Sequence, residues 1–493
     1  MSTDSTHHIR FWPVMIAIFL GSFVTVLSMS TINIAIPVLM NELNSSLSTM
    51  QWTITGFMLA MGTVAPLTGF LGDRFSYKRL YVFALVGFTV TSALCALAWD
   101  PASLVFFRIL QGCFTGLVMP ATMTIIYQVV PRERQAMAIS LWSLSAMLAP
   151  AFGPTISGWL IDNWNWQFMF WFNVPFGIVS IVLAFILIPY YRLNVPKAFD
   201  FFGLLTVVVG SLSLLIAISE GHKWGWSDVK TIGLIALGII VIGLFIWREL
   251  KVKVPLLNLR VFRNGRYTIT LIIASIITIS LYSGTYLTPL FLQQIQRVTP
   301  LDSGLILLPA SLAMAIAMPA VGKLYGKIGP MRLMIAGIAL IAVGTLALSW
   351  LSVDVSHGYI IFWMLVRNIG IALSTMPASN AGMEEIPREL SGHASSINNW
   401  IRNVLGSFAI ALFTSMLASR QTAHVADLKQ TAETASDQAA IGVQAFTMSV
   451  NDVYLLATII VLVSLPIALL VRKKPKPEMA VAPAADSGKS ATA

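Results

Sequence analysis

Arg108 lies several residues inside a long apolar run, and such a position calls for a chemical explanation. If the run crosses a bilayer, a charge near the bilayer centre costs about 2.5–3.5 kcal/mol, so it usually signals a function or a buried partner. The alternative is that the long side chain reaches the nearby membrane surface. Because Arg108 is near one end of its run, both interpretations stay open, and we favour the functional one. Arg367 has a similar depth in a later run and is its expected counterpart.

Carboxylates that could carry a proton do not occur in the middle of any apolar run. The acids nearest to the runs are Asp162, Asp200, Glu220, Asp302 and Asp452. Of these we take Glu220 and Asp452 as weak candidates for proton binding. For each of the two alone, a charge solvated at a membrane surface is the better explanation.

The stretch from residue 69 to residue 80 is a short charged turn between two apolar runs. Its basic residues alone are explained by the rule that positive loops stay on the cytoplasmic side, but that rule does not call for an acid such as Asp73. Charges at helix ends contribute about 0.3–1 kcal/mol each. We therefore predict that the turn is a latch between two helix bundles that gates one end of the molecule. The residues of this predicted latch are Gly69, Asp73, Arg74, Lys78 and Arg79.

The frame of this turn recurs at residues 322–333, where five residues match at one constant offset. The chain therefore looks duplicated. The two copies are unequal, because Gly326 stands where the first copy has Asp73.

Composition places these residues in a membrane protein that crosses the bilayer many times. Of the 493 residues, 57% are hydrophobic and 11% are charged, whereas soluble domains carry roughly 25% charged residues. A net charge of +10 would suit nucleic-acid binding, but here the positive residues gather in loops on one side of the predicted membrane, where they attract anionic lipid. We therefore predict no nucleic-acid partner. Cys95 and Cys113 have no spacing suited to a metal site.

Fourteen runs are long enough to cross a bilayer, which takes a helix of about 20 residues. With the N-terminus in the cytoplasm, most of the 31 Lys and Arg residues fall in cytoplasmic loops and tails. We predict an all-α polytopic protein of the cytoplasmic membrane with both termini inside.

The first charged turn joins spans 2 and 3. Two equal halves of six spans would place the second turn between spans 8 and 9, but it joins spans 10 and 11, so two extra spans lie between the halves. We predict a six-helix bundle at 1–190, two inserted helices and a basic linker at 191–266, a second six-helix bundle at 267–472, and a disordered tail at 473–493. No catalytic domain fits between the spans, and the tail lacks a phosphate-binding loop. We therefore predict that the chain is not an enzyme and needs no cofactor. Any transport would then follow the concentration gradient of the substrate or be driven by an ion gradient.

Several stretches resemble the major facilitator superfamily. The charged turn resembles its signature loop, Arg108-Ile-Leu-Gln-Gly112 resembles its Arg-x-x-Gln-Gly motif, and residues 149–158 resemble the antiporter motif of its drug-exporting branches. With fourteen spans, the chain is similar to the 14-spanner drug:proton antiporters, the EmrB/QacA-like exporters. The resemblance implies two six-helix bundles with two extra central helices, and a role in proton coupling for Arg108, to which we join Gln111.

The antiporter-like stretch has Pro150, Gly153, Pro154 and Gly158 within nine positions. Small residues allow helices to approach closely, and proline bends a helix. We predict that this helix seals the path between the bundles against ion leak. The alternative is the ordinary tolerance of membrane helices for these residues.

The chain departs from the family pattern at Ser28, where members often carry an aspartate ahead of the matching Asn33, Ala35 and Pro37. Serine cannot carry a proton at physiological pH. Either an acid at a span end titrates, alone or together with Arg108, or coupling works differently from that in members with the aspartate.

Aromatic, methionine and polar residues of the spans could line a substrate cavity, since flexible Met-rich walls suit several ligands. For any single one, packing in the core or against lipid is the more economical explanation. The candidates are Ser28, Met29, Asn33, Trp52, Phe57, Met119, Trp142, Met147, Asn398, Asn399 and Arg402.

These features together predict proton-coupled efflux of lipophilic or cationic small molecules by alternating access, carried out by a monomer. Two alternatives stay open: export of an endogenous metabolite or lipid, and a non-transporting scaffold or sensor. The sequence does not decide whether an adaptor protein is recruited.

Overall fold

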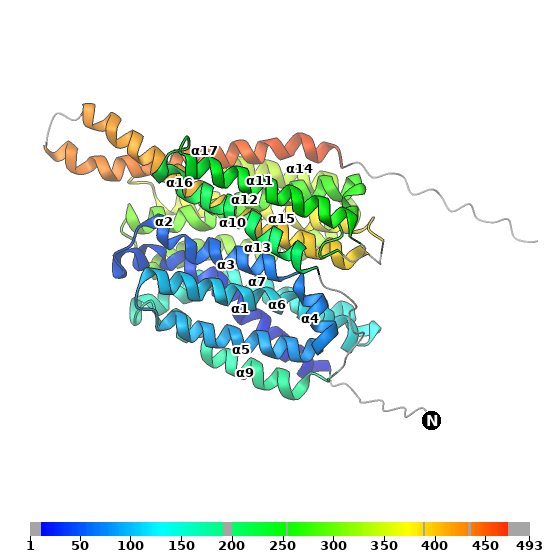
Figure 1. Ribbon diagram of the computed structural model, residues 1–493. Helices are drawn as coiled ribbons and strands as arrows, with labels where there is room; N and C mark the ends of the chain where they lie inside the picture. The colour runs from blue at the N-terminus through cyan, green and yellow to red at the C-terminus, as the bar shows by residue number, and fades with distance from the viewer. Residues whose placement is uncertain (1–10, 191–199, 253–254, 388–389, 432–434, 472–493) are drawn as a thin grey trace, which may run out of the picture.

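The computed structural model describes residues 11–190, 200–252, 255–387, 390–431 and 435–471, which form helices and no strands (Figure 1). The predicted all-α fold is confirmed. The predicted disordered tail at 473–493 lies outside the described residues.

The helices form two bundles, one from each end of the chain (Figure 1). The first bundle contains α1 (Phe11–Glu42), α2 (Leu47–Met50), α3 (Trp52–Val64), α4 (Leu67–Phe75), α5 (Tyr77–Ala96), α6 (Pro101–Val129), α7 (Arg132–Asn163), α8 (Phe168–Trp171) and α9 (Asn173–Leu187). The second contains α12 (Gly265–Gln294), α13 (Pro300–Ile328), α14 (Pro330–Ala347), η2 (Leu348–Trp350), α15 (His357–Met383), α16 (Ser391–Thr431) and α17 (Ala435–Leu469). Between them in sequence lie α10 (Phe201–Trp224), α11 (Val229–Lys251) and the 3-10 helix η1 (Leu259–Arg263). Helix α10 packs on α11 and on α16, so the inserted pair lies against the second bundle.

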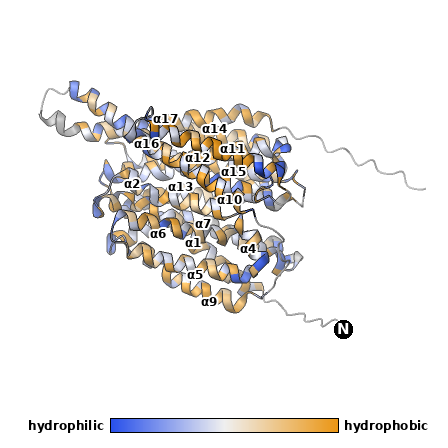
Figure 2. Ribbon diagram, viewed as in Figure 1, coloured by the Kyte–Doolittle hydropathy of each residue, from blue (hydrophilic) through white to orange (hydrophobic). Residues whose placement is uncertain are grey.

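Twelve helices in the described part of the chain are long and apolar enough to cross a membrane, and α3 with α4 would make a thirteenth span. These two helices are bent by 55° at a break that contains Pro66, whose ring removes a backbone donor. Helix α7 is 32 residues long and has an uncharged stretch at 136–161, although it is not among the twelve. The protein is a multi-pass membrane protein with an apolar middle and polar ends (Figure 2), while the count of fourteen spans stays a prediction.

Sequence signals set the helix ends. Asp100 caps α6 by accepting the backbone N–H of Ser103 at 2.7 Å, and Pro101 occupies the first turn. Hydrogen bonds with the backbone and the side chain of Ser103 hold the pKa of Asp100 below its usual range. Thr299 and Pro300 start α13 in a similar way.

The two matching charged turns share an unusual backbone conformation. Ser76 between α4 and α5 has φ 87°, and Gly329 between α13 and α14 has φ 85°. These two residues hold the same position in the two copies, so the duplication is also present in the backbone. Glycine adopts this region freely, whereas a serine is strained there.

The stretch at 418–450 is helical wherever it is described. Helix α16 continues to Thr431 and α17 begins at Ala435. Together they form a hairpin that projects beyond the bundles at upper left in Figure 1.

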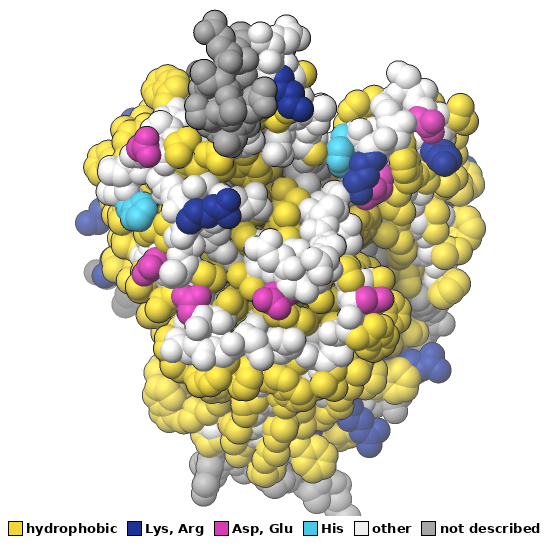
Figure 3. Space-filling view, turned by 90° about the vertical axis from the view of Figure 1, so that its left-hand side faces the viewer, with side chains coloured by type: hydrophobic (Ala, Val, Ile, Leu, Met, Phe, Trp, Pro, Cys, Tyr) yellow, Lys and Arg dark blue, Asp and Glu magenta, His cyan; other side chains and the backbone are white. Residues whose placement is uncertain are grey.

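The described chain starts and ends at one end of the bundles, where the charged turn and η1 also lie (Figure 1). We call this the basic end. Its basic residues include Arg74, Lys78, Arg79, Arg248, Arg260, Arg263 and Arg332. The opposite end, which faces the viewer in Figure 3, carries scattered charges of both signs.

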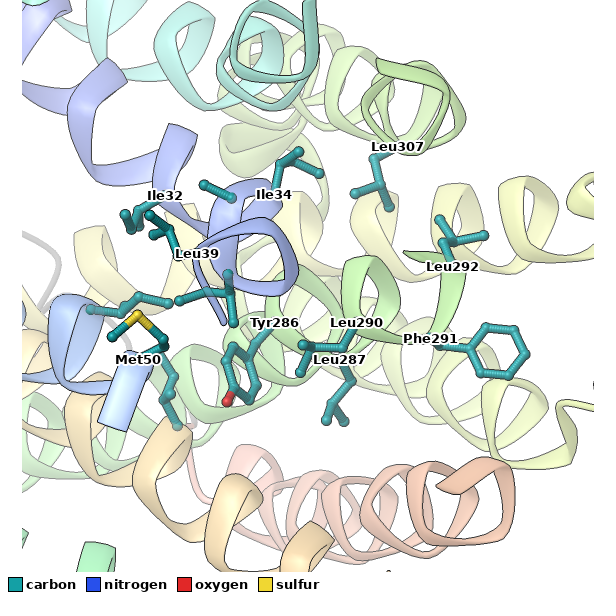
Figure 4. Packing of buried hydrophobic residues seen from close by; sticks show 14 of the residues in the cluster. Ile32, Ile34, Leu39, Met50, Tyr286, Leu287, Leu290, Phe291, Leu292 and Leu307 are labelled. Carbon is teal, nitrogen blue, oxygen red and sulfur yellow. The ribbon is translucent and has the colours of Figure 1, made fainter. Parts of the chain in front are cut away.

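A buried apolar cluster joins the two bundles towards the opposite end (Figure 4). From α1 and α2 it takes Ile32, Leu39 and Met50, and from α12 it takes Tyr286 and Leu290. Three other buried clusters each stay within the first bundle or within the second bundle and its inserted helices. A small fifth cluster, of Leu59, Leu215, Val404 and Ala411, joins α3 to α10 and α16.

Candidate transport site

The side chain of Arg108 is completely buried and is held by three helices. Its Nε donates to the carbonyl of Thr53 at 3.1 Å, and its Nη1 donates to Ser28 Oγ at 3.3 Å and to Gln111 Oε1 at 2.6 Å. The guanidinium carbon lies 4.1 Å from the centre of the Phe57 ring. Arg108 therefore does not extend to the protein surface, and four residues predicted to be functional meet at one point.

Among the residues that the structure describes, neutral groups and no carboxylate surround this charge. Gln111 is itself oriented by Ser92, which accepts its Nε2 at 2.6 Å. The Nη2 of Arg108 has no hydrogen-bond partner among the described residues. A buried charge is expensive without compensation, and here dipoles and the π face of Phe57 supply it.

Arg367 of α15 repeats this arrangement in the second bundle. It is also completely buried, and its Nη2 donates to the carbonyl of Ser280 and, at 3.2 Å, to Ser283 Oγ. Its Nε has no partner in the described part of the chain. Each bundle thus places a buried arginine against a serine of its own first helix, α1 or α12.

The antiporter-like residues lie where the bundles touch. A Cβ added to Gly158 would stand 2.4 Å from the carbonyl oxygen of Pro300, and one added to Gly304 would stand 2.7 Å from that of Pro154. Thr155 Oγ1 donates to the carbonyl of Gly304 at 3.2 Å. Helices α7 and α13 therefore pack backbone to backbone.

Helix α7 makes two further contacts, one with α13 and one with α1. Asp162 accepts the backbone N–H of Leu301 at 2.9 Å, which also ties α7 to α13. Gly153 faces α1, where an added Cβ would collide with Ser30 Oγ. Pro150 and Pro154 lie within α7, which runs as one continuous helix.

A second junction joins α3 to α16. Ser407 Oγ donates to the carbonyl of Thr55 at 2.9 Å, and Gly62 packs against Asn403. Thr55 is two residues from Thr53, whose carbonyl binds Arg108. Helix α3 thus connects the buried arginine directly to the second bundle.

The other cavity candidates differ in their surroundings. Partly buried are Met29, Asn33, Trp52, Met119, Trp142, Asn398 and Asn399, and Arg402 is exposed. Trp142 Nε1 donates to Thr122 Oγ1 at 3.0 Å, and the side-chain oxygens of Asn33 and Asn398 are buried without a partner in the described residues. The side chain of Met147 lies outside the described residues.

The predicted latch contacts its own bundle in this structure. Arg74 lies over Phe70 and Phe75, Lys78 lies 5.4 Å from the Phe185 ring centre, and Arg79 lies 5.0 Å from that of Tyr190. A Cβ added to Gly69 would meet nothing within 4 Å. A gating contact with the second bundle stays a prediction.

The two acids proposed for proton binding have local partners. Glu220 accepts from Lys223 at 2.9 Å, one helical turn away. Asp452 accepts from Arg420 and from His424 Nε2, the latter at 2.8 Å, and these contacts join α16 to α17. Neither acid contacts Arg108, and both arrangements favour solvated ion pairs.

Sequence reasoning missed Gly304, Gln293 and Glu249. Gly304 carries the junction with α7, and Gln293 Nε2 donates across the bundles to the carbonyl of Ile34 at 2.9 Å. Glu249 is buried at the basic end of α11. Glu249 could have been found in the sequence, because it is an acid at the end of an apolar run. Gly304 and Gln293 stand alone and have no such pattern around them.

The two-bundle fold agrees with the comparisons. The family model described as Major Facilitator Superfamily matches residues 18–410, and the chain belongs to this superfamily. It is 33% identical to the uncharacterized MFS-type transporter YhcA of Bacillus subtilis (strain 168), over 85% of this chain and 79% of that protein. The protein is thus a transporter of this superfamily and not an enzyme.

Two other comparisons extend this result. The chain is 29% identical to the tetracenomycin C resistance and export protein of Streptomyces glaucescens, over 83% of this chain and 77% of that protein. Among solved structures it resembles a bacterial homolog of the human lysosomal transporter Spinster, described as inward-facing and unoccupied, with a TM-score of 0.65 and 14% identity over 96% of this chain and 100% of that one. The second likeness shows the fold alone.

Proposed function

We propose that this protein exports lipophilic or cationic small molecules across the cell membrane in exchange for protons, by alternating access. Relatives named for drug resistance and export support the direction of transport. The site, described above, supports the mechanism.

The asymmetric contact between the bundles is the observation that carries this proposal. The shared apolar cluster and the glycine junction close the end opposite to the basic end. The basic end, where the larger buried clusters are separate and only the small cluster of α3, α10 and α16 spans the bundles, faces the cytoplasm by the positive-inside rule. In this orientation the space between the bundles would be reached from the cytoplasm, where an exporter collects its substrate.

Close packing at the junction suits exchange of two solutes. Backbone contact between α7 and α13 would exclude a chain of water molecules that could leak protons. Rocking of one bundle against the other about α7 and α3 would then move access from one side to the other. The charged turn would latch the basic end in the outward-open state.

The buried arginines would keep the coupling ion and the substrate apart. A fixed positive charge at Arg108 repels cations nearby and responds to any carboxyl group that gains or loses a proton. Ser28 does not supply that carboxyl group, so a proton carrier elsewhere in the chain is part of the proposal. The protein acts as a monomer without a cofactor in this account.

Purified protein in proteoliposomes tests the proposal. An imposed pH gradient should drive accumulation of a lipophilic cation such as ethidium, and a protonophore that dissipates the gradient should abolish it. Liposomes without protein give the background. Absence of gradient-driven movement for ethidium, for tetracenomycin C and for a lipid probe would contradict the proposal, whereas movement of the lipid probe alone would favour lipid export.

A further inference from the structure

A buried pair of carboxyl groups lies at the basic end, where the inserted helices meet the second bundle. Asp200 precedes α10 and is 5% exposed, and Glu249 in the last turn of α11 is 2% exposed. Both lie against Gly203: a Cβ added there would stand 2.5 Å from Glu249 Oε1 and 2.9 Å from Asp200 Oδ2. The two side chains therefore share one small site.

The hydrogen bonds account for three of the four carboxyl oxygens. Asp200 Oδ1 accepts the backbone N–H of Gly203 at 2.8 Å, and Arg248 Nε donates to Oδ1 at 2.9 Å and to Oδ2 at 3.2 Å. Glu249 Oε2 accepts the backbone N–H of Leu257 at 2.7 Å. Glu249 Oε1 is buried and has no partner in the described part of the chain, although it lies beside Asp200.

The charges in this site do not balance if both acids are ionised. Arg248 can compensate one carboxylate, and Glu249 has no ion pair among the described residues. The other ionisable groups on the packed elements are engaged elsewhere or exposed: Lys251 lies over Trp247, His393 of α16 contacts the backbone N–H of Asn258, and Arg260 and Arg263 of η1 are exposed. Two like charges in a site shielded from water are unfavourable, and one proton held between them removes the imbalance and gives Oε1 a partner.

We propose that Asp200 and Glu249 form a proton-binding site that holds one proton between the two carboxyl groups and fastens the inserted helices to the second bundle. The fastening follows from Leu257, which Glu249 binds and which is fully buried in a cluster with Val207, Phe245 and Tyr267. That cluster contains side chains of α10, α11, η1, α12 and α16. Loss of the proton would place two negative charges together and loosen this connection. The site stands on these contacts and does not depend on the proposed substrate or direction of transport.

Infrared spectroscopy of the full-length protein in nanodiscs tests the site. The carbonyl band of a protonated carboxyl group should be present at neutral pH, should disappear as the pH is raised, and should be lost in Glu249→Gln and in Asp200→Asn. The matched control is Glu220→Gln, which removes a partly exposed acid and should leave the band unchanged. A band that is missing in the wild type, or that persists in either Glu249→Gln or Asp200→Asn, overturns the proposal.

A second measurement does not depend on the folding of any variant. After a rapid pH rise, an indicator dye should report release of one proton per wild-type molecule in step with the loss of the band. Release that is unaccompanied by loss of the carbonyl band would assign the proton to another group and overturn the proposal.

Discussion

Arg108 Nη1 and Ser28 Oγ lie 3.3 Å apart, at the position where many members of the family place an aspartate. The second bundle repeats the pairing, with Arg367 Nη2 and Ser283 Oγ at 3.2 Å. In both pairs a neutral hydroxyl accepts from a buried guanidinium. The positive charge therefore stays fixed, and the coupling proton of the proposed exchange would bind elsewhere.

Restoring the family aspartate should stabilise the protein. In Ser28→Asp the carboxylate would accept from the guanidinium of Arg108, whose Nη2 has no partner in the described residues. Hydrogen bonds to charged groups contribute about 1.5–3 kcal/mol, so we expect a higher melting temperature in detergent. The dependence of transport on pH should also change from that of the wild type, because the new carboxyl group adds a titrating group.

Ser30→Asp is the control for this prediction. Ser30 lies on the same helix but donates to the carbonyl of Ala149 and faces Gly153, so a carboxylate there meets α7 and not Arg108. This variant should melt at a lower temperature than the wild type. Equal melting temperatures for the two variants would show that Arg108 needs no anionic partner.

The glycine junction should be intolerant of added side chains. Gly304→Leu pushes α13 away from α7, and overpacking of this kind costs about 1–3 kcal/mol. We expect the initial rate of transport in proteoliposomes to fall about tenfold, as a cost of about 1.4 kcal/mol implies. Gly326→Leu is the matched control in the same helix, because a Cβ there meets nothing within 4 Å. If both variants transported at the wild-type rate, the junction would not be required.

The strained turn offers a gain in stability. Ser76 has φ 87° and a buried Oγ without a partner in the described residues, so Ser76→Gly removes both costs. Residues held in such conformations cost about 1–3 kcal/mol, and thermal unfolding should move to higher temperature. The reciprocal change, Gly329→Ser, should lower it. A lower melting temperature for Ser76→Gly would show that the backbone conformation of Ser76 does not destabilise the protein.

Neutralising the two partly exposed acids, Glu220 and Asp452, should leave coupling intact. Asp452→Asn breaks contacts with Arg420 and His424, and Glu220→Gln breaks the contact with Lys223. Exposed ion pairs contribute about 0.2–1 kcal/mol, so a modest change in stability is expected. The ratio of proton flux to substrate flux should match that of the wild type. A folded variant that transports substrate without protons would identify its acid as the carrier.

Much of the architecture follows from hydropathy and the matching turns. A run of about 20 apolar residues has few alternatives to a membrane helix, and the offset between the two turns predicted the duplication that Ser76 and Gly329 display in the backbone. The hairpin of α16 and α17 beyond the membrane is less evident from sequence, because its Ala-rich and Gln-rich stretch forms helix without an apolar stripe.

The sites were less accessible to sequence reasoning. Burial cost alone identified Arg108, but its contact with Thr53 is made through a backbone carbonyl, which has no signature in sequence. Gly304 looked like any glycine in a membrane helix until Pro154 was placed beside it. Asp200 and Glu249 are separated by a helical hairpin, so only the packing of α10 on α11 brings them together.

Substrate-driven proton movement tests the central claim of exchange most directly. Proteoliposomes that contain a trapped pH dye are prepared without a pH gradient, and ethidium is added outside. Entry of ethidium should move protons outward, so that the internal pH rises at a rate proportional to ethidium entry and falls back when the ethidium gradient is collapsed. Entry of ethidium through the protein with no change in internal pH would contradict the account.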